Sequence, residues 1–348
     1  MYNQKIINPG YVNDNPETLH FGSFYRKQWV DIIGNPTSFS FFSHLPLSNQ
    51  LEAGVSFVND EIGEGALKEN NLTADLAYIL KVSEKIKISL GLKAGATFLD
   101  TDFSKFRLES GGPNTDPAFS QNINQTYPTL GTGAFLFTDT YYLGISTPNF
   151  LTSKHLNNAN SIQAVGSEEI HMYLTGGYVF KVSQSLKVKP SFLLRAVQGS
   201  SAMIDLSANL LYLNRFEAGV SYRYDDSISA LMSIGITTNL KFGYAYDYTT
   251  TNLGNYTSGT HEIFLLYNFV IIFFDTILFS SFFVISIVVL LVIGTENFTI
   301  EFILGESSLV LISILFPTNN VFGFPYFLYC LIIVLISLSF TFNFFKTF

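Results

Sequence analysis

Carboxylates and histidines are the residues of this chain whose types could support catalysis. Asp75, Asp205, Asp247, His261 and Glu262 all fall in segments that we predict below as strands, and such groups can act as general acids or bases. No Ser-His-Asp spacing is recognisable among them. We therefore predict that the chain is not an enzyme and that its carboxylates pair with basic side chains inside the fold. The basic residues available for this are Lys87, Lys93, Arg195 and Arg223.

Metal and cofactor sites are equally poorly supported. Oxygen ligands of the kind that Ca²⁺ prefers occur together at Asn59, Asp60, Glu61 and Glu64, but their spacing matches no known calcium loop, so we predict a solvated loop. Cys330 is the single cysteine, and no pair of the five histidines has the spacing of a metal site. The run 111–113 (Gly-Gly-Pro) predicts a turn, because no helix follows it. We expect no metal and no cofactor.

Composition points to a membrane. Only 13% of the residues are charged, against about 25% in typical soluble domains, while 16% are aromatic. An aromatic excess of this kind suits a surface that faces lipid. The net charge is −8 and the basic residues are scattered singly, so nucleic acid is not an expected partner.

The dominant period up to residue 269 is two. In the segment 86–98, alternate positions from Ile88 to Phe98 are apolar, and the intervening positions from Lys87 to Thr97 are small or polar. Segments 216–224 and 240–249 repeat the pattern. Successive side chains of a strand point to opposite faces, so each segment predicts a strand with one apolar and one polar face.

Fourteen such segments are predicted, an even number as bacterial single-chain barrels require. They lie near 20–31, 37–46, 51–59, 70–82, 86–98, 127–137, 140–148, 169–182, 186–198, 201–212, 215–225, 227–237, 240–249 and 260–269. Every second connection is short, whereas several of the others are long: 60–69, 99–126, 149–168 and 250–259. Outer-membrane barrels have short periplasmic turns and longer outer loops. A soluble β-sandwich or periplasmic β domain is the alternative, but neither has reason to sort its loops in this way.

The last predicted strand ends as outer-membrane barrels commonly end. Ile263, Leu265, Tyr267 and Phe269 share one face, and we predict Tyr267 and Phe269 as the C-terminal barrel signal. In hydrocarbon every backbone polar group must be paired within the protein, so the sheet must close. The predicted fold is an all-β, transmembrane antiparallel barrel of about 14 strands over 20–269. Residues 1–19 precede it as a possible plug, and residues 270–348 follow it as a tail.

An ordered series of motifs resembles the PorP/SprF family of Bacteroidota outer-membrane proteins. The series begins with Ile7-Asn8-Pro9-Gly10-Tyr11 and Tyr25-Arg26-Lys27-Gln28-Trp29-Val30, and continues through 54–63, 148–150, 219–223, 226–231, 243–248 and 258–263. The resemblance spans essentially 1–269. It implies a part in type IX secretion and gliding motility, with partners among secretion components and secreted, adhesin-like cargo. It also implies an outer-membrane location, although no signal peptide is visible, and we expect a truncated start.

The tail differs in kind from the rest of the chain. Residues 270–294 and 321–345 are apolar stretches long enough to span a bilayer as helices. Such helices conflict with an outer-membrane destination. Phe, Ile, Leu and Ser dominate the tail, so we interpret it as read-through or a gene-model artefact, with a genuine inner-membrane anchor as the alternative.

Two functions from different classes follow. The first is a non-enzymatic outer-membrane component that assists the export or surface attachment of specific cargo. The second is a passive channel or a transporter of lipophilic solutes. Candidate contacts with a partner or within the lumen are Asn8, Pro9, Tyr11, Arg26, Lys27, Trp29, Asn59 and Asp60. For Trp29, a place in the interfacial aromatic girdle is the alternative.

Overall fold

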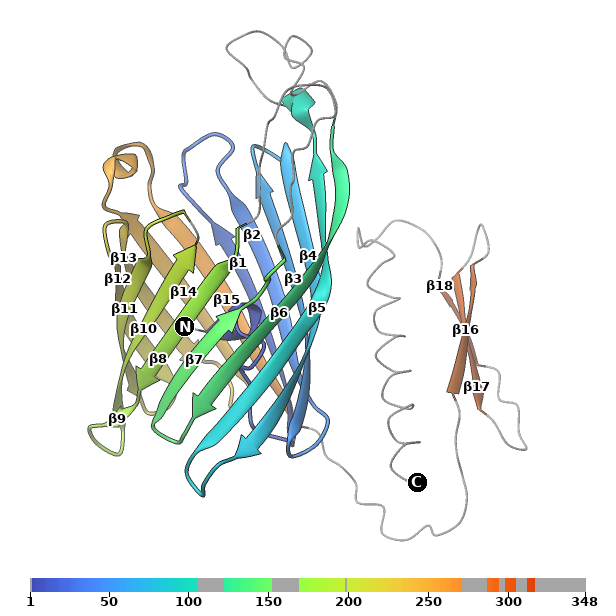
Figure 1. Ribbon diagram of the computed structural model, residues 1–348, viewed down its shortest axis with the longest axis horizontal. Helices are drawn as coiled ribbons and strands as arrows, with labels where there is room; N and C mark the ends of the chain where they lie inside the picture. The colour runs from blue at the N-terminus through green and yellow to red at the C-terminus, as the bar shows by residue number, and fades with distance from the viewer. Residues whose placement is uncertain are drawn as a thin grey trace. The chain divides into compact units, whose positions relative to one another are not determined.

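The computed structural model describes residues 2–105, 122–151, 169–197 and 199–270, together with three short strands of the tail. Residues 1–270 contribute one antiparallel sheet, drawn from blue to orange in Figure 1. Its strands are β1 (Thr18–Lys27), β2 (Thr37–Pro46), β3 (Leu51–Ile62), β4 (Leu67–Lys81), β5 (Lys87–Thr101), β6 (Asn124–Phe137), β7 (Tyr141–Thr147), β8 (His171–Tyr178), β9 (Phe180–Lys181), β10 (Leu186–Val197), β11 (Met203–Tyr212), β12 (Phe216–Arg223), β13 (Ser227–Gly235), β14 (Leu240–Thr249) and β15 (Thr260–Val270).

The sheet closes on itself. β1 pairs antiparallel with β15 from Thr18 opposite Val270 to Lys27 opposite His261, so the first and last strands leave no free edge between them. The two-residue β9 continues β8, because both pair with β10. The wall therefore has fourteen strands, which confirms the predicted antiparallel barrel. Closure pairs the backbone polar groups of the edge strands within the protein, which is necessary because lipid offers them no hydrogen-bond partners.

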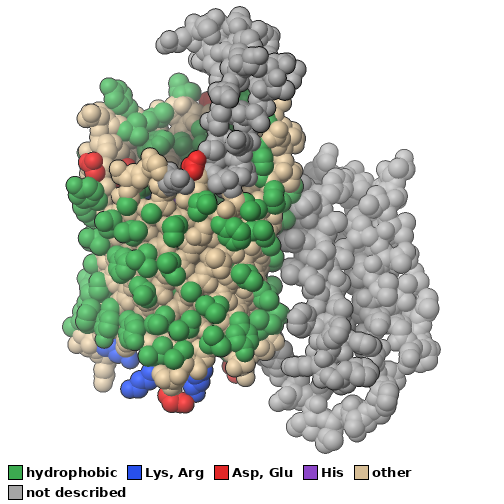
Figure 2. All heavy atoms as spheres, viewed as in Figure 1, with side chains coloured by type: hydrophobic (Ala, Val, Ile, Leu, Met, Phe, Trp, Pro, Cys, Tyr) green, Lys and Arg blue, Asp and Glu red, His purple; other side chains and the backbone are tan. Residues whose placement is uncertain are grey.

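The alternation within each strand is the reason for this arrangement. On β5, Leu90 and Leu92 are 50% and 68% exposed on the outside, whereas Ser89, Lys93 and Thr97 are buried inside. The outer surface carries hydrophobic side chains over its height, with charged side chains gathered below them (Figure 2). The predicted apolar face therefore faces outward and the polar face lines the lumen, as in transmembrane barrels.

Aromatic residues mark both ends of the outer apolar surface. Near the short turns, exposed aromatic side chains come from several neighbouring strands: Tyr78, Tyr141, Tyr178, Phe180, Tyr212, Phe216, Tyr267 and Phe269. Near the opposite end they are Tyr25, Phe39, Tyr222, Tyr224 and Tyr248. Such rings favour the two membrane interfaces. Tyr267 and Phe269 thus lie in this girdle, while their role as a targeting signal stays a prediction.

We expect a depth-dependent cost for charge on this outer face. Leu92→Arg near the middle of the apolar band should destabilise the barrel by about 2–4 kcal/mol, because arginine is costly at the bilayer midplane. Tyr224→Arg, close to the interface, should cost only about 0–1 kcal/mol. The measurement is reversible urea unfolding in lipid vesicles. Equal costs at the two positions would contradict this assignment of the lipid-facing surface.

The connections sort by parity, as predicted. The turn between β2 and β3 spans 47–50, and the turn between β11 and β12 spans 213–215; both lie at what we call the short-turn end. The longer connections lie at the long-loop end, and the outer-membrane rule places them outside the cell. The strands β3 and β4 extend further than expected, so the loop predicted over 60–69 is only a turn over 63–66. The polar residues there, such as Asn59 and Asn70, continue the ladder with a mutual hydrogen bond of 2.9 Å.

The tail is a separate compact unit, residues 274–348. Its described strands β16 (Ile287–Ile293), β17 (Phe298–Leu304) and β18 (Ile312–Phe316) pair antiparallel. Strand β16 falls within the stretch 270–294, over which a helix was expected, and residues 271–286 and 294 of that stretch lie outside the described residues. The second expected helix, 321–345, lies outside the described residues. No helix among the described residues is long and apolar enough to cross a membrane.

Candidate functional site: a lumen filled by the N-terminal segment

The N-terminal segment, residues 2–17, enters the barrel and lies in its lumen (Figure 1). It contains one helical turn, α1 (Gln4–Ile7). The last carbonyls of a helix lack partners within it, and here the barrel wall supplies them. Lys93 on β5 donates to the Ile6 carbonyl at 2.6 Å, and Ser146 on β7 donates to the Ile7 carbonyl at 2.8 Å. The turn is thus held by hydrogen bonds from two strands of the wall.

Asn8, Pro9 and Gly10 form the most closely packed part of the segment. The Asn8 side chain accepts from the Gly10 N–H at 2.8 Å and donates to the Ala134 carbonyl on β6 at 3.2 Å. Glycines of the wall make room for this stretch. A Cβ at Gly91 would lie 2.3 Å from the Pro9 carbonyl, and a Cβ at Gly133 would lie 2.1 Å from the Asn8 side-chain oxygen.

Lys5 anchors the segment electrostatically. Its side chain is fully buried and forms an ion pair with the buried Asp75 on β4, while Glu52 on β3 lies 3.9 Å from the ammonium. The ammonium also donates to the Tyr11 carbonyl at 3.1 Å. Glu52 in turn accepts from the Asn13 N–H at 2.9 Å and contacts His44. Because buried charges are stable only when paired, Lys5 and Asp75 depend on each other.

Two tyrosines of the segment reach different parts of the wall. Tyr2 donates to Glu217 on β12, and the Lys241 ammonium lies 5.0 Å from its ring. Tyr11 packs edge-on against Phe135 on β6 at 5.1 Å between centroids. Burial raises the pKa of the Tyr11 phenol to about 12. Contacts to β3–β7 on one side and to β12, β14 and β15 on the other mean that the segment bridges the lumen.

Two cavities lie on either side of the segment at the short-turn end. One, of about 520 Å³, is lined by aromatic residues such as Phe137 and Tyr142 and by Lys85 and Lys87. The other, of about 580 Å³, is lined by Arg215 and Lys241 and by the turn 236–239. Tyr2, Tyr11 and Asn13 line both cavities. The N-terminal segment therefore divides this mouth of the barrel.

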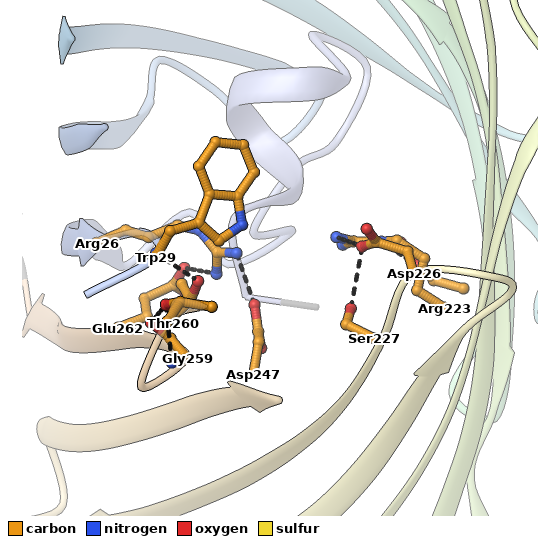
Figure 3. Close-up of polar contacts among 11 residues, drawn as sticks. Arg26, Trp29, Arg223, Asp226, Ser227, Asp247, Gly259, Thr260 and Glu262 are labelled. Atoms are coloured by element: carbon orange, nitrogen blue, oxygen red, sulfur yellow. Dashed lines mark hydrogen bonds and ion pairs between the residues drawn. The ribbon is translucent and has the colours of Figure 1, made fainter. Parts of the chain in front are cut away.

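The long-loop half of the lumen holds a second group of charges (Figure 3). Arg26 on β1 forms ion pairs with Asp247 at 2.6 Å and with Glu262 at 3.2 Å. Arg223 pairs with Asp205 at 2.7 Å and with Asp226 at 3.1 Å. The Arg223–Asp205 pair joins two residues that were predicted from the sequence to form interior charge pairs, whereas Asp247 and Glu262 pair with Arg26, which was not predicted as their partner. Residue Lys27, next to Arg26, is exposed on the opposite face.

The Trp29 prediction requires a correction. Strand β1 ends at Lys27, so Trp29 is not on the strand. It lies in the connection that follows, with a φ of 47°. Its backbone N–H donates to the Thr260 hydroxyl at 3.2 Å. The positive φ reverses the chain here and ends the ladder earlier than the predicted residue 31.

Removing the Arg26 side chain should destabilise the barrel. In Arg26→Ala, the buried Asp247 and the half-buried Glu262 lose their charged partner, and we expect a cost of about 2 kcal/mol, since a bond to a charged group contributes roughly 1.5–3 kcal/mol. The readout is the temperature at which the folded, faster-migrating band disappears in a semi-native gel. Lys27→Ala is the matched control and should change stability by less than about 0.5 kcal/mol. An equal shift in both variants would contradict the assignment.

Asn59 and Asp60 are placed differently from the predicted solvated loop. Both lie within β3, near its long-loop end. Asp60 accepts from the Ser38 hydroxyl on β2, and Glu61 pairs with Lys68 at 3.7 Å. Their side chains thus make contacts between neighbouring strands.

Several residues of the lumen were missed by sequence reasoning. Lys5, Glu52 and Glu217 were not singled out, although all three hold the N-terminal segment. His20 and His44 stand opposite each other on β1 and β2, with ring centroids 5.5 Å apart. Their spacing of 24 residues in the sequence gives no indication of this. A usable signal was present for Glu52 and Glu217, because each occupies a polar-face position of its strand.

Together these features define the class of protein: a transmembrane β-barrel of the outer-membrane type whose lumen is filled by its own N-terminal segment. The chain belongs to the PorP/SprF family, described as type IX secretion system membrane proteins, whose match covers residues 1–267. It is therefore an outer-membrane protein of the type IX secretion system. No curated protein matches the chain.

Two solved structures are similar to this chain. The Ralstonia pickettii toluene transporter TbuX is 12% identical, with 76% of this chain and 92% of that chain covered and a TM-score of 0.44. The Acinetobacter baumannii outer membrane protein Omp33 is 10% identical, with 74% and 100% covered and a TM-score of 0.42.

Proposed function

We propose that this protein is a non-enzymatic docking component of type IX secretion and gliding, which assists the export or surface attachment of specific cargo. The observation that supports this best is the filled lumen. Lys5, Asn8 and Tyr2 tie the N-terminal segment to opposite parts of the wall. A barrel occupied in this way offers its two ends to partners, whereas a channel needs a continuous open path.

The proposed partners are secretion components and an adhesin-like cargo protein. In the test, the tagged chain is expressed behind a signal peptide in a Bacteroidota host, extracted from outer membranes and purified under mild conditions. We expect type IX components or a secreted adhesin to co-purify. A tagged barrel of another family from the same host is the control.

The alternative, a passive channel or lipophilic-solute transporter, makes the opposite prediction. Recovery of the barrel without partners, together with steady ion conductance of the unaltered protein in planar bilayers, would overturn the docking proposal in favour of the channel.

A further inference from the structure

The two ends of the barrel differ in their balance of charge. The short turns and adjoining strand ends carry seven basic residues, named here the basic mouth: Lys81, Lys85, Lys87, Lys181, Lys187, Arg215 and Lys241. The acidic residues of the same turns and strand ends are Glu52, Glu84, Asp139 and Glu217, with Asp14 and Glu17 on the N-terminal segment. Seven basic residues thus stand against six acidic ones, whereas the chain as a whole has a net charge of −8.

The long-loop end shows the reverse balance among the described residues. Its acidic side chains are Asp31, Asp60, Glu61, Glu64, Glu69, Asp100, Asp102, Glu169, Asp225 and Asp226, against the basic Lys27, Lys68, Lys105 and Arg223. This difference in charge gives the two mouths different electrostatic fields, and such fields steer charged partners toward one of them.

Part of the basic mouth has no carboxylate partner. Lys81 pairs with Glu84 at 3.1 Å and Lys87 with Asp14 at 2.6 Å. Within the described part of the chain, Lys85, Lys181 and Lys187 form no ion pair, and Arg215 donates only to the Gly235 carbonyl at 2.9 Å. Lys85, Lys181 and Arg215 are exposed. The unpaired positive charges of these side chains are therefore available to a negatively charged partner.

The negatively charged partner of the basic mouth is either a lipid phosphate or an acidic polypeptide, and the strand register distinguishes between the two. Phosphates of the lipid leaflet would meet residues on the lipid-facing positions, and there the strand ends present Phe180, Val182 and Tyr212. Lys187 instead lies two residues before Lys189, which pairs with Glu217 in the lumen at 2.8 Å, and Lys181 stands opposite Lys187. Lys181 and Lys187 therefore occupy lumen-facing positions at the mouth, and Lys85 lines the cavity of about 520 Å³.

We propose that the basic mouth binds an acidic polypeptide segment of a periplasmic protein, with Lys85, Lys181 and Lys187 as its principal contacts. This inference rests on the proposed docking function and adds the face used and the chemistry of the partner. Aromatic side chains at the same mouth, Phe137 and Tyr142, would contact the apolar part of such a segment.

The test uses the purified full chain in nanodiscs of zwitterionic lipid and a fluorescent 20-residue poly-L-glutamate as the probe. Binding is followed by fluorescence anisotropy at low and high salt. The variant is K85Q/K181Q/K187Q, and the matched control, K27Q/K68Q/K105Q, removes the same charge at the other end. We expect the first to weaken binding roughly tenfold at low salt, as losing about 0.5 kcal/mol per pair implies. In about 0.1 M salt the control should bind within about twofold of the original, since its charges lie at the other end of the barrel, beyond the Debye length of about 10 Å.

Equal weakening by both variants, or no binding of poly-L-glutamate by the original chain, would overturn the proposal. Selective loss of binding to phosphatidylglycerol vesicles, with poly-L-glutamate binding retained, would overturn it in favour of lipid. Heat-modifiable gel mobility verifies that each variant is folded, and the K85E/K181E/K187E variant should bind poly-L-lysine instead. Because the probe is synthetic, failure here leaves the co-purification result for the docking function intact.

Discussion

Gly91→Leu is expected to displace the N-terminal segment and to open the lumen. Even the Cβ of the new side chain would lie 2.3 Å from the Gly10 nitrogen and the Pro9 carbonyl, both backbone atoms that no side-chain rotation can move away. Overpacking of this kind costs roughly 1–3 kcal/mol in a close-packed interior. The barrel wall is fixed by its hydrogen-bonded ladder, so the segment should yield first.

Conductance in planar bilayers measures this effect. The original protein should conduct little, and Gly91→Leu should raise the mean current by roughly tenfold or more, because a fourteen-stranded barrel without a plug encloses an aqueous path. Ala94→Leu is the matched control, since Ala94 is exposed on the opposite, lipid-facing side of the same strand. If both variants conduct like the original protein, the segment is not what closes the lumen.

Asp75→Asn is expected to weaken the binding of the N-terminal segment to the barrel wall, while the space that the segment occupies stays free. The substitution keeps the shape of the side chain but leaves the fully buried Lys5 ammonium with Glu52, at 3.9 Å, as its remaining carboxylate, in addition to its hydrogen bond to the Tyr11 carbonyl. Breaking a buried ion pair by removing one partner costs about 3–5 kcal/mol. Because the remaining carboxylate compensates in part, we expect a value near about 3 kcal/mol, which corresponds to roughly a hundredfold faster opening.

Hydrogen–deuterium exchange of residues 2–12 is the direct measurement, because local opening governs exchange. Amides of the barrel wall, such as those of β12, should keep their protection. The double variant Lys5→Met/Asp75→Leu is the decisive comparison: replacing both charges with apolar groups is often nearly neutral, so protection should return. Unchanged exchange in Asp75→Asn would show that the ion pair does not hold the segment.

The barrel itself could be predicted from the sequence because the pattern that produces it lies within each strand. Each strand alternates apolar and polar residues, and a bilayer around the fold turns that alternation into an inside and an outside. Leu90, Leu92 and Val220 therefore face outward as predicted, and Asp205 and Arg223 meet in the lumen as predicted. Pairing of neighbouring strands also follows from chain order, because short turns join them.

The strand ends were less predictable. The Trp29 backbone reverses the chain through a positive φ, which nothing in the residue type favours. Beyond the membrane, β3 and β4 continue with polar residues on both faces, so the alternation that predicts a strand disappears while the hydrogen-bonded ladder goes on.

Only the tertiary structure decided how the N-terminal segment is bound. The sequence marked Asn8, Pro9 and Tyr11 as candidate lumen contacts and the first residues as a possible plug. It could not join Lys5 to Asp75, or Asn8 to Gly133, because those partners lie 70 and 125 positions away and meet only when the sheet closes. The same holds for the basic mouth, whose lysines come from separate turns. A two-residue period determines which face a side chain takes, whereas closure of the barrel determines which side chains share the space inside it.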